Sequence, residues 1–186
     1  MASIISHAAA GAAISISFRP EGAPVRYWPL ALVTAVLPDM DSFLYYFRVS
    51  YSYSLGHRGF FHSPFFGLIV CFILMLVFFR DEALFSGRWF RFFALFFVVW
   101  LSHGFLDALT NGGRGVAFFS PFSSGRYFLP WRPIQVSPIS IRSFFSSWGW
   151  SILKSELVWI WLPGLGLVVL SGIIRRRVQT QRSRLQ

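Results

Sequence analysis

Long apolar runs separated by short polar turns set the pattern of this chain. Five such runs stand out, over residues 3–18, 27–47, 64–79, 89–109 and 157–174. A helix that crosses a bilayer needs about 20 mainly apolar residues, so the third run is long enough only for a thin or locally deformed bilayer. The pattern predicts an all-α fold, a polytopic membrane helix bundle with about five membrane-embedded helices.

The segment between the fourth and fifth runs, residues 111–155, differs from the rest. It combines a glycine-rich start with several prolines and many serines, residues that favour turns. It also carries Trp131, Trp148 and Trp150, and tryptophan is enriched at the boundary between water and lipid. We therefore expect an ordered loop at the outer face, with a short hairpin or an interfacial helix within it.

The composition agrees with a membrane protein. Of the 186 residues, 55% are hydrophobic and only 13% are charged, which is not the profile of a soluble domain. The net charge of +10 would suit a nucleic-acid partner, but the densest basic cluster, RRRVQTQRSR, directly follows the last apolar run, where an anchor beside anionic lipid is expected. We expect membrane lipids as partners and no nucleic acid. The predicted domains are a single integral membrane domain over 1–174 and a basic cytoplasmic tail over 175–186.

The positive charges also orient the chain. The arginines that begin the basic tail place the C-terminus in the cytoplasm, and alternating the spans back from there places the N-terminus and residues 111–155 outside. In this topology, all four histidines and four of the seven carboxylates fall in one outer layer. The members of this layer are His7, Asp39, Asp41, His57, His62, His103, Asp107 and Glu156. Their convergence is the strongest indication of function in the sequence.

Three short motifs supply most of this layer. LPDMD places Asp39 and Asp41 two residues apart, a spacing that converges only where a helix is broken or beginning, and Pro38 can supply that distortion. SHGFLDALT places His103 and Asp107 at i and i+4, on one helical face. HRGFFH adds two more imidazoles, on a short turn that its glycine allows.

Imidazole and carboxylate donors together indicate a transition-metal site. Such sets suit Zn, Mn, Fe or Ni better than Mg or Ca, which prefer oxygen ligands. A centrally placed Asp in a membrane helix costs about 2.5–3.5 kcal/mol, and a bound cation would remove that cost. Any one residue could instead be a packed polar group, but jointly they predict a divalent metal, Zn first with Mn or Fe compatible, and more than one ion. The predicted ligands are His7, Asp39, Asp41, His57, His62, His103 and Asp107.

The candidates for catalysis in this region are Asp41, Arg58 and Glu156, with Asp107 as an alternative base. Arg58 does not ligate metals and could hold an anionic group such as phosphate, with a lipid-headgroup contact or an ion pair to an aspartate as equal alternatives. Asp41 could act as general base if it is not a ligand, and so could Asp107. Glu156 could be a ligand, a general base, or a carboxylate favoured by the dipole at the start of the last helix. Polar neighbours that could orient ligands are Ser63, Thr110 and Asn111.

In combination, an early histidine, PDMD, HRGFFHS, HGFLD followed by T, and FFSPFS resemble the YdjM family of bacterial inner-membrane proteins. The resemblance runs from His7 to Glu156, over most of the chain. It implies a multi-pass protein of the bacterial inner membrane and a metal-dependent hydrolase activity, and it identifies no substrate. The ligand types alone are also similar to those of zinc-dependent phospholipase C and the P1-type nucleases, which cleave phosphoesters with clustered zinc.

The residues and the resemblance together predict a membrane-embedded hydrolase. We expect metal-activated water to attack an ester or phosphoester of an amphiphilic, anionic, lipid-like substrate at the outer face of the inner membrane. One alternative is a metal or proton-coupled transporter, for which the sequence shows no paired repeat. The other is a non-catalytic membrane scaffold. The sequence does not predict the oligomeric state.

Overall fold

The computed structural model describes residues 1–45, 47–48, 50–51, 53–138 and 147–184. Regular secondary structure in this part of the chain is helical, as predicted. The elements are α1 (Ile4–Ser17), α2 (Tyr27–Val36), the 3-10 helices η1 (Leu37–Tyr45) and η2 (Phe60–His62), α3 (Pro64–Phe78), α4 (Gly87–Ala108), α6 (Ser147–Glu156), the π-helical turn η3 (Leu157–Trp161) and α7 (Leu162–Arg184). Residues 139–146 of the predicted outer loop and 185–186 of the predicted tail lie outside the described residues.

Local sequence explains where several helices begin. The side-chain oxygens of Ser3, Ser63 and Ser86 each accept a hydrogen bond from the backbone N–H three residues later, at the starts of α1, α3 and α4. Pro64 occupies the first position of α3, where its missing N–H costs nothing. α2 narrows into η1 next to Pro38, which has no N–H to donate. The second apolar run is therefore two elements, broken where the sequence predicted a distortion.

The last helical stretch begins at Ser147, well before the start of the fifth apolar run, and continues through α6, η3 and α7 to Arg184. The predicted start was wrong because α6 is polar overall yet buries Gly149, Ile152 and Glu156, a spacing that puts all three on one helical face. Glu156 therefore lies inside a helical stretch and not at a helix start. The basic segment predicted as a tail continues α7.

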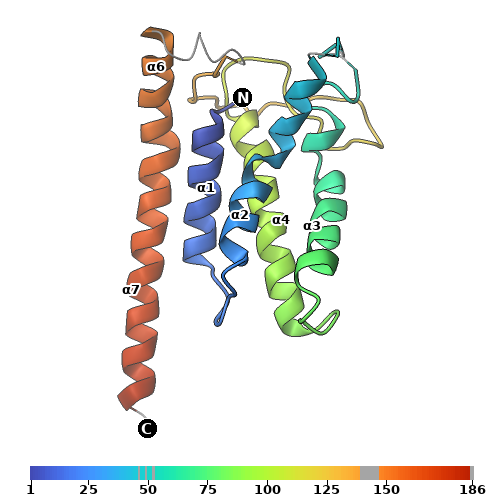
Figure 1. The fold of residues 1–186 in the computed structure, drawn as a ribbon. Coiled ribbons are helices and arrows are strands. Elements are labelled where there is room, and N and C mark those ends of the chain that lie inside the picture. Colours follow the sequence, from blue (N-terminus) through green and yellow to red (C-terminus); the bar gives the residue numbers. More distant parts are fainter. Residues whose placement is uncertain (46, 49, 52, 139–146, 185–186) are drawn as a thin grey trace.

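α4 forms the centre of the bundle. It packs against α1, α2 and α3, while α7 lies along α1 at one edge (Figure 1). The core between α2, α3 and α4 is largely aromatic, with Tyr27, Phe96 and Trp100 fully buried. Among the described residues, Gly87–Ala108 and Ser147–Gln181 are helical stretches long and apolar enough to cross a membrane, whereas α1 and α3 are apolar but shorter. The number of embedded helices therefore stays a prediction.

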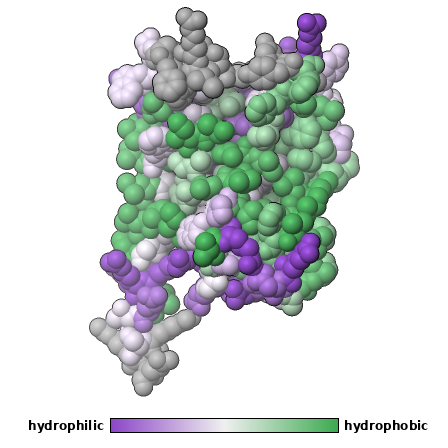
Figure 2. All heavy atoms as spheres, in the orientation of Figure 1, coloured by the Kyte–Doolittle hydropathy of each residue, from purple (hydrophilic) through white to green (hydrophobic). Residues whose placement is uncertain are grey.

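An apolar band covers the face of the bundle that Figure 2 shows. Large hydrophobic side chains of α3 and α7 are exposed on it, among them Ile73, Val77, Leu165 and Leu170. Figure 2 shows this band, with hydrophilic residues gathered below it. We call the end where α1 begins and α4 ends the N-terminal end of the bundle, and the end that holds the α1–α2 and α3–α4 turns the C-terminal end (Figure 1).

Two glycines set the distances between neighbouring helices. A Cβ on Gly11 of α1 would lie 2.4 Å from the Cβ of Ala35 in α2, and a Cβ on Gly67 of α3 would lie 2.3 Å from Cδ1 of the Trp100 indole in α4. The indole is fixed there because its N–H donates to the Ser63 carbonyl at 3.2 Å. Since that carbonyl belongs to the HRGFFHS turn, the same contact holds the turn against α4.

We predict that Gly67→Ala destabilises the bundle, because the added methyl group has no room beside the buried indole of Trp100. Overpacking of this kind costs about 1–3 kcal/mol, so the midpoint of thermal unfolding in detergent should fall by several degrees. Gly172→Ala in α7 is the matched control, since a Cβ there meets nothing within 4 Å. Equal midpoints for the two variants would contradict the close packing of α3 on α4.

Candidate metal centre

The N-terminal end of the bundle brings six ionisable side chains together. They come from η1, from the turn that ends in η2, and from the last turns of α4. In a 3-10 helix, residues two apart are separated by about 120° around the axis, against about 160° in an α-helix. η1 thereby turns Asp39 and Asp41 toward the same interior, and both are almost fully buried. The six are Asp39, Asp41, His57, His62, His103 and Asp107.

Four of these residues form a first donor group. One donor atom from each lies within 4.8 Å of the other three, and all four residues are buried. The Nε2 atoms of His62 and His103 are 3.2 Å apart. Oδ1 of Asp39 lies 3.4 Å from Nε2 of His103 and 3.6 Å from Nε2 of His62. Oδ2 of Asp107 lies 3.6 Å from Nε2 of His62. Two imidazole nitrogens and two carboxylate oxygens are donors that suit a four-coordinate transition-metal ion.

Hydrogen bonding decides which nitrogen of His103 faces this group. Nδ1 of His103 lies 2.8 Å from the carbonyl oxygen of Ala35. A carbonyl oxygen only accepts, so Nδ1 carries the proton, and Nε2 of the neutral ring keeps its lone pair. Histidines that bind metals are commonly oriented in this way by an acceptor behind the ring. His103 is thus held in the tautomer that a metal requires.

A second donor group shares His62 with the first. It consists of Asp41, His57 and His62. Oδ1 of Asp41 is 2.6 Å from Nδ1 of His57, and Oδ2 is 2.9 Å from Nδ1 of His62, the latter without hydrogen-bond geometry. His62 therefore presents Nδ1 to one group and Nε2 to the other. Asp41 can orient this ring for a single ion, or join the two histidines around a second one.

Several buried polar atoms of the cluster have no hydrogen-bond partner among the described residues. Both carboxylate oxygens of Asp39, Oδ2 of Asp41 and Nε2 of His57 are of this kind. A buried polar group left unsatisfied costs about 1–3 kcal/mol, and more when it is charged. A cation would satisfy these oxygens and nitrogens together. The residues present therefore fit a divalent metal ion.

His7 of α1 lies beside the cluster. Its ring stacks on that of His103, with centroids 3.7 Å apart, and its Nε2 is 3.4 Å from Oδ1 of Asp107. Neither ring nitrogen of His7 has a hydrogen-bond partner among the described residues. Neither donor group includes His7, so its role as a ligand stays a prediction.

Arg58 supports the cluster from inside the protein, where its side chain is completely buried. Its Nε donates to Oδ2 of Asp107 at 3.0 Å. Its Nη2 donates to the Thr110 hydroxyl at 2.9 Å and its Nη1 to the Gly112 carbonyl at 3.0 Å. The backbone N–H of Ala2 donates to the other oxygen of Asp107 at 2.9 Å. Arg58 thus forms the ion pair with an aspartate that the sequence left open, and its burial does not support the alternative of substrate binding.

The HRGFFHS turn has an unusual backbone. Arg58 has a φ of 61°, in the left-handed region, at a cost of about 1–3 kcal/mol. A Cβ on the adjacent Gly59 would lie 2.1 Å from the Ser54 carbonyl oxygen, so only glycine fits there. Arg126 of the long loop holds the turn by donating to the His57 carbonyl at 2.8 Å. These contacts maintain the strained backbone that aims both imidazoles inward.

Glu156 belongs to a separate network. Its carboxylate oxygens accept hydrogen bonds from the N–H and hydroxyl of Ser3, at 2.5 and 2.6 Å, and from the hydroxyl of Ser6 at 2.8 Å. The indole N–H of Trp161 also donates to Ser6. The network joins the last helical stretch to α1, and neither donor group includes Glu156. These hydrogen bonds give Glu156 a structural role, and its catalytic role stays a prediction.

The polar residues expected to orient ligands differ in what they do. Thr110 accepts from Arg58 and donates to the Asp107 carbonyl at 2.8 Å, so it supports the cluster. Ser63 caps α3, and the side-chain oxygen of Asn111 accepts from a backbone N–H of the long loop. The expectation is met for Thr110 alone of these three.

Three contributors are missing from the sequence prediction. Ser3 and Ser6 lie three residues apart at the start of an apolar helix, and this spacing, which places two hydroxyls on one face, could have revealed them. Arg126 lies 69 residues from the carbonyl of His57 that it binds. No local pattern connects two positions so far apart in the chain.

The two histidines of the turn differ in their affinity for protons. Burial lowers the pKa of His57, and the hydrogen bond to Asp41 opposes this only in part. Burial also disfavours the charged form of His62, but the carboxylates of Asp41 and Asp39 outweigh it and raise the pKa of His62 to about 9. Metal ions compete with protons for imidazole. A cation at these groups would therefore take the place of the proton on His62.

Nearly the whole chain matches a known family of membrane proteins. Residues 1–178 match the family model described as YdjM inner membrane protein. This chain belongs to the YdjM family. A curated relative, inner membrane protein YbcI of Escherichia coli (strain K12), is 34% identical over 173 residues, which is 90% of this chain and 95% of that protein. No solved structure shows significant similarity to the chain.

Membership of the YdjM family confirms the resemblance drawn from the sequence motifs. The protein is thus a membrane protein of an inner-membrane family. Both matching descriptions state a location and neither states an activity. The geometry of the buried histidines and carboxylates is therefore what indicates a function.

We predict that Asp39→Asn lowers the affinity for zinc at least about tenfold, because neither carboxylate oxygen of Asp39 has a hydrogen-bond partner among the described residues. The measurement is zinc retained by detergent-purified protein after equilibrium dialysis. Asp81→Asn is the matched control, since that exposed carboxylate pairs with Arg26 at the C-terminal end. If the two variants, both eluting as folded protein, retained the same zinc, Asp39 would not be a ligand.

We further predict that Arg58→Lys lowers zinc affinity about 10- to 100-fold although it keeps the positive charge. A lysine cannot reproduce the three contacts that hold Asp107, Thr110 and the Gly112 carbonyl. Arg114→Lys, at an exposed position of the long loop after α4, controls for the exchange itself. Wild-type zinc affinity in the Arg58 variant would show that charge alone, and not orientation of Asp107, is what Arg58 supplies.

Proposed function

We propose that this protein is a metal-dependent hydrolase embedded in the inner membrane. The observation that carries the proposal is the pair of buried donor groups that meet at His62, with carboxylate and imidazole atoms left unpartnered. With neutral imidazoles, the three aspartates and Arg58 leave an excess of two negative charges, which one divalent ion balances. Zinc suits these nitrogen and oxygen donors best, Mn or Fe also fit, and the two nitrogens of His62 would allow a second ion.

The chain's own residues suit hydrolysis at such an ion. A bound metal would supply a Lewis acid and lower the pKa of a water molecule. Asp39, His103 and Asp107 are placed to hold the ion. Asp41 lies between His57 and His62, with one oxygen free of hydrogen bonds, so it is the carboxylate best placed to accept a proton. The residues that hold Asp107 in place act only by positioning it.

An apolar cavity next to the cluster supports an amphiphilic substrate. The cavity, of about 290 Å³, is lined by apolar side chains of η1, η2 and α3, including Leu44, Phe61, Phe66 and Val70, and it reaches Asp41. Its lining is almost wholly apolar, which suits a hydrocarbon chain. An ester or phosphoester bonded to such a chain would lie near the donor groups. We therefore propose a lipid-like, anionic substrate.

The distribution of positive charge supports a site at the outer face. Exposed arginines gather at the C-terminal end of the bundle, among them Arg80, Arg88, Arg91 and Arg177, where Figure 2 shows the hydrophilic residues below the apolar band. Positive residues favour the cytoplasmic side of a membrane. The N-terminal end, with the donor groups, then faces outward in this multi-pass arrangement.

The transporter alternative is less well supported. Apart from Glu156, which binds Ser3 and Ser6 at the N-terminal end, the carboxylates outside the donor groups are Glu21, Asp81 and Glu82. These three lie in the α1–α2 and α3–α4 turns at the C-terminal end. Among the described residues, no carboxylate or histidine lies between these turns and the donor groups. A proton or metal path across the bundle would need such groups at intermediate depth. The arrangement fits a site open to one side of the membrane.

The test is a hydrolysis assay with zinc-loaded protein in detergent. We expect release of product from phosphatidylglycerol, phosphatidic acid or a lipid carboxylic ester, loss of turnover with a chelator, and recovery with added zinc. Asp39→Asn should be as slow as the chelated protein, and Asp81→Asn should match the wild type. Turnover that persists in Asp39→Asn, or zinc-loaded protein that hydrolyses none of these esters, would contradict the proposal.

A further inference from the structure

A second cavity lies at the C-terminal end of the bundle, away from the donor groups. Its volume is about 670 Å³, larger than that of the cavity at Asp41. It lies between the end of α1, the turn that follows, and the first half of α4. No part of it contains a residue of the candidate metal centre. Any ligand of this cavity is therefore separate from the proposed hydrolase reaction.

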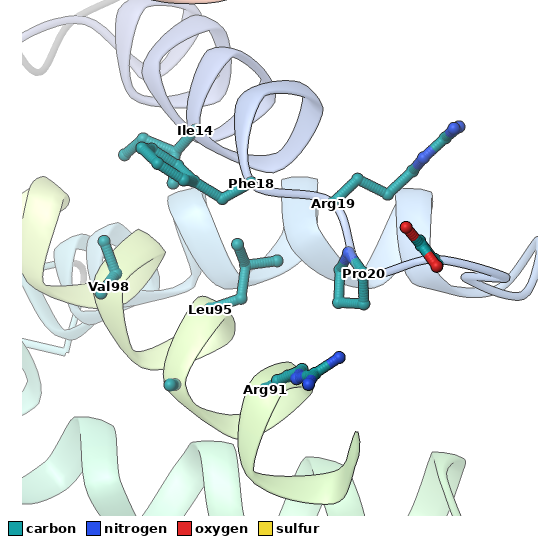
Figure 3. Close-up of a pocket in the computed structure, with 9 residues that line it drawn as sticks. Ile14, Phe18, Arg19, Pro20, Arg91, Leu95 and Val98 are labelled. Carbon is teal, nitrogen blue, oxygen red and sulfur yellow. The ribbon is translucent and has the colours of Figure 1, made fainter. Parts of the chain in front are cut away.

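The chemistry of this cavity is split between its two ends. Figure 3 shows the side chains of Arg19 and Arg91 extending to one side, and those of Ile14, Phe18 and Val98 on the other. Val98 lies two helical turns beyond Arg91 on α4, about 10 Å along the axis. Because α4 runs from the C-terminal end toward the N-terminal end, the apolar part of the cavity lies deeper in the apolar band. The basic part lies at its polar edge.

The two arginines are available to a ligand. Neither guanidinium forms an ion pair with a described residue, and Arg19 lies over the Trp28 ring at 5.8 Å. Glu21 also lines the cavity, so one of the two positive charges stays uncompensated there. Arg175 adds a further cation nearby, since it donates to the carbonyls of Ser17 and Arg19. The polar edge of the cavity is therefore net positive.

The shape of the cavity follows from small residues. α1 is pressed against its neighbours at Gly11, where a Cβ would meet Ala35 at 2.4 Å and Val99 at 3.3 Å. Nearer the C-terminal end of the bundle, Ala94 of α4 is exposed and leaves a gap. The exposed Phe18 borders this gap without filling it. An apolar gap open to the lipid band is filled in a membrane by hydrocarbon. The headgroup of a lipid whose chain fills this gap would lie at the net-positive edge of the cavity.

We propose that this cavity binds one anionic phospholipid of the leaflet at the C-terminal end. The phosphate lies between Arg19 and Arg91, and one acyl chain follows Ile14, Leu95 and Val98. Two guanidinium groups are strong partners for a phosphate, and their attraction for anionic lipid is additive near a membrane surface. The lipid joins the end of α1 to α4 at this edge, beside the contact of Arg88 with the Gly22 carbonyl.

The test is native mass spectrometry of the full-length protein in detergent, with phosphatidylglycerol as the probe. We expect Arg19→Ala combined with Arg91→Ala to weaken binding about 10- to 30-fold. Arg80→Ala combined with Arg177→Ala removes the same charge from exposed positions at the same end and should change binding less than threefold. Equal binding by the two double variants would overturn the proposal.

A third variant distinguishes binding of the acyl chain in the apolar gap from attraction between the arginines and the headgroup. Ala94→Trp fills the apolar gap and keeps both arginines, so it should also weaken phosphatidylglycerol binding about tenfold, at an unchanged midpoint of thermal unfolding. Wild-type affinity in this variant would overturn the placement of the acyl chain. Phosphatidylcholine bound as tightly as phosphatidylglycerol would overturn the role of the arginines, and inorganic phosphate bound as tightly as the lipid would overturn the choice of a phospholipid.

Discussion

The buried charge at the N-terminal end is the constraint on which the rest of the structure depends. Asp39, Asp41 and Asp107 lie within an apolar helix bundle, and Arg58 is the buried cation that pairs with one of them. A proton on His62 offsets one of the two remaining charges, and a divalent ion would offset both. Carboxylates in this position persist only when a cation or hydrogen-bond donors satisfy them. The strained turn and the packing of α4 against it bring those partners together.

Much of the bundle and the membership of the cluster could be predicted from the sequence. Apolar runs predicted the helices, and the i, i+4 spacing of His103 and Asp107 predicted their shared face. The sequence predicted a short hairpin or an interfacial helix in the outer loop, but not that α6 continues into the last helix, because the buried positions of α6 are interrupted by polar residues. The partners of Glu156 and Arg58 were not predicted either, because they lie far away in the chain. Local spacing cannot reveal a contact such as that between Glu156 and Ser3, 153 residues apart.

The two ends of the bundle have different chemistry, and the difference follows the direction of the helices. At the N-terminal end, η1, η2 and α4 converge and enclose acidic and imidazole groups. At the C-terminal end the turns carry arginines around an apolar gap between α1 and α4. One arrangement favours a cation inside the protein, and the other favours an anionic headgroup at the membrane surface. The proposed hydrolysis and the proposed lipid site are compatible in one bundle because the two sites share no residue.

The central claim is that imidazoles and carboxylates of this cluster bind a metal ion directly. X-ray absorption at the zinc edge of purified, zinc-loaded protein tests it most directly, because the spectrum reports the ligand atoms themselves. The account predicts nitrogen and oxygen ligands at about 2.0–2.2 Å with the outer-shell scattering of imidazole, and loss of the imidazole contribution in His62→Ala combined with His103→Ala. Zinc surrounded by oxygen alone, or an identical spectrum in that variant, would contradict the account.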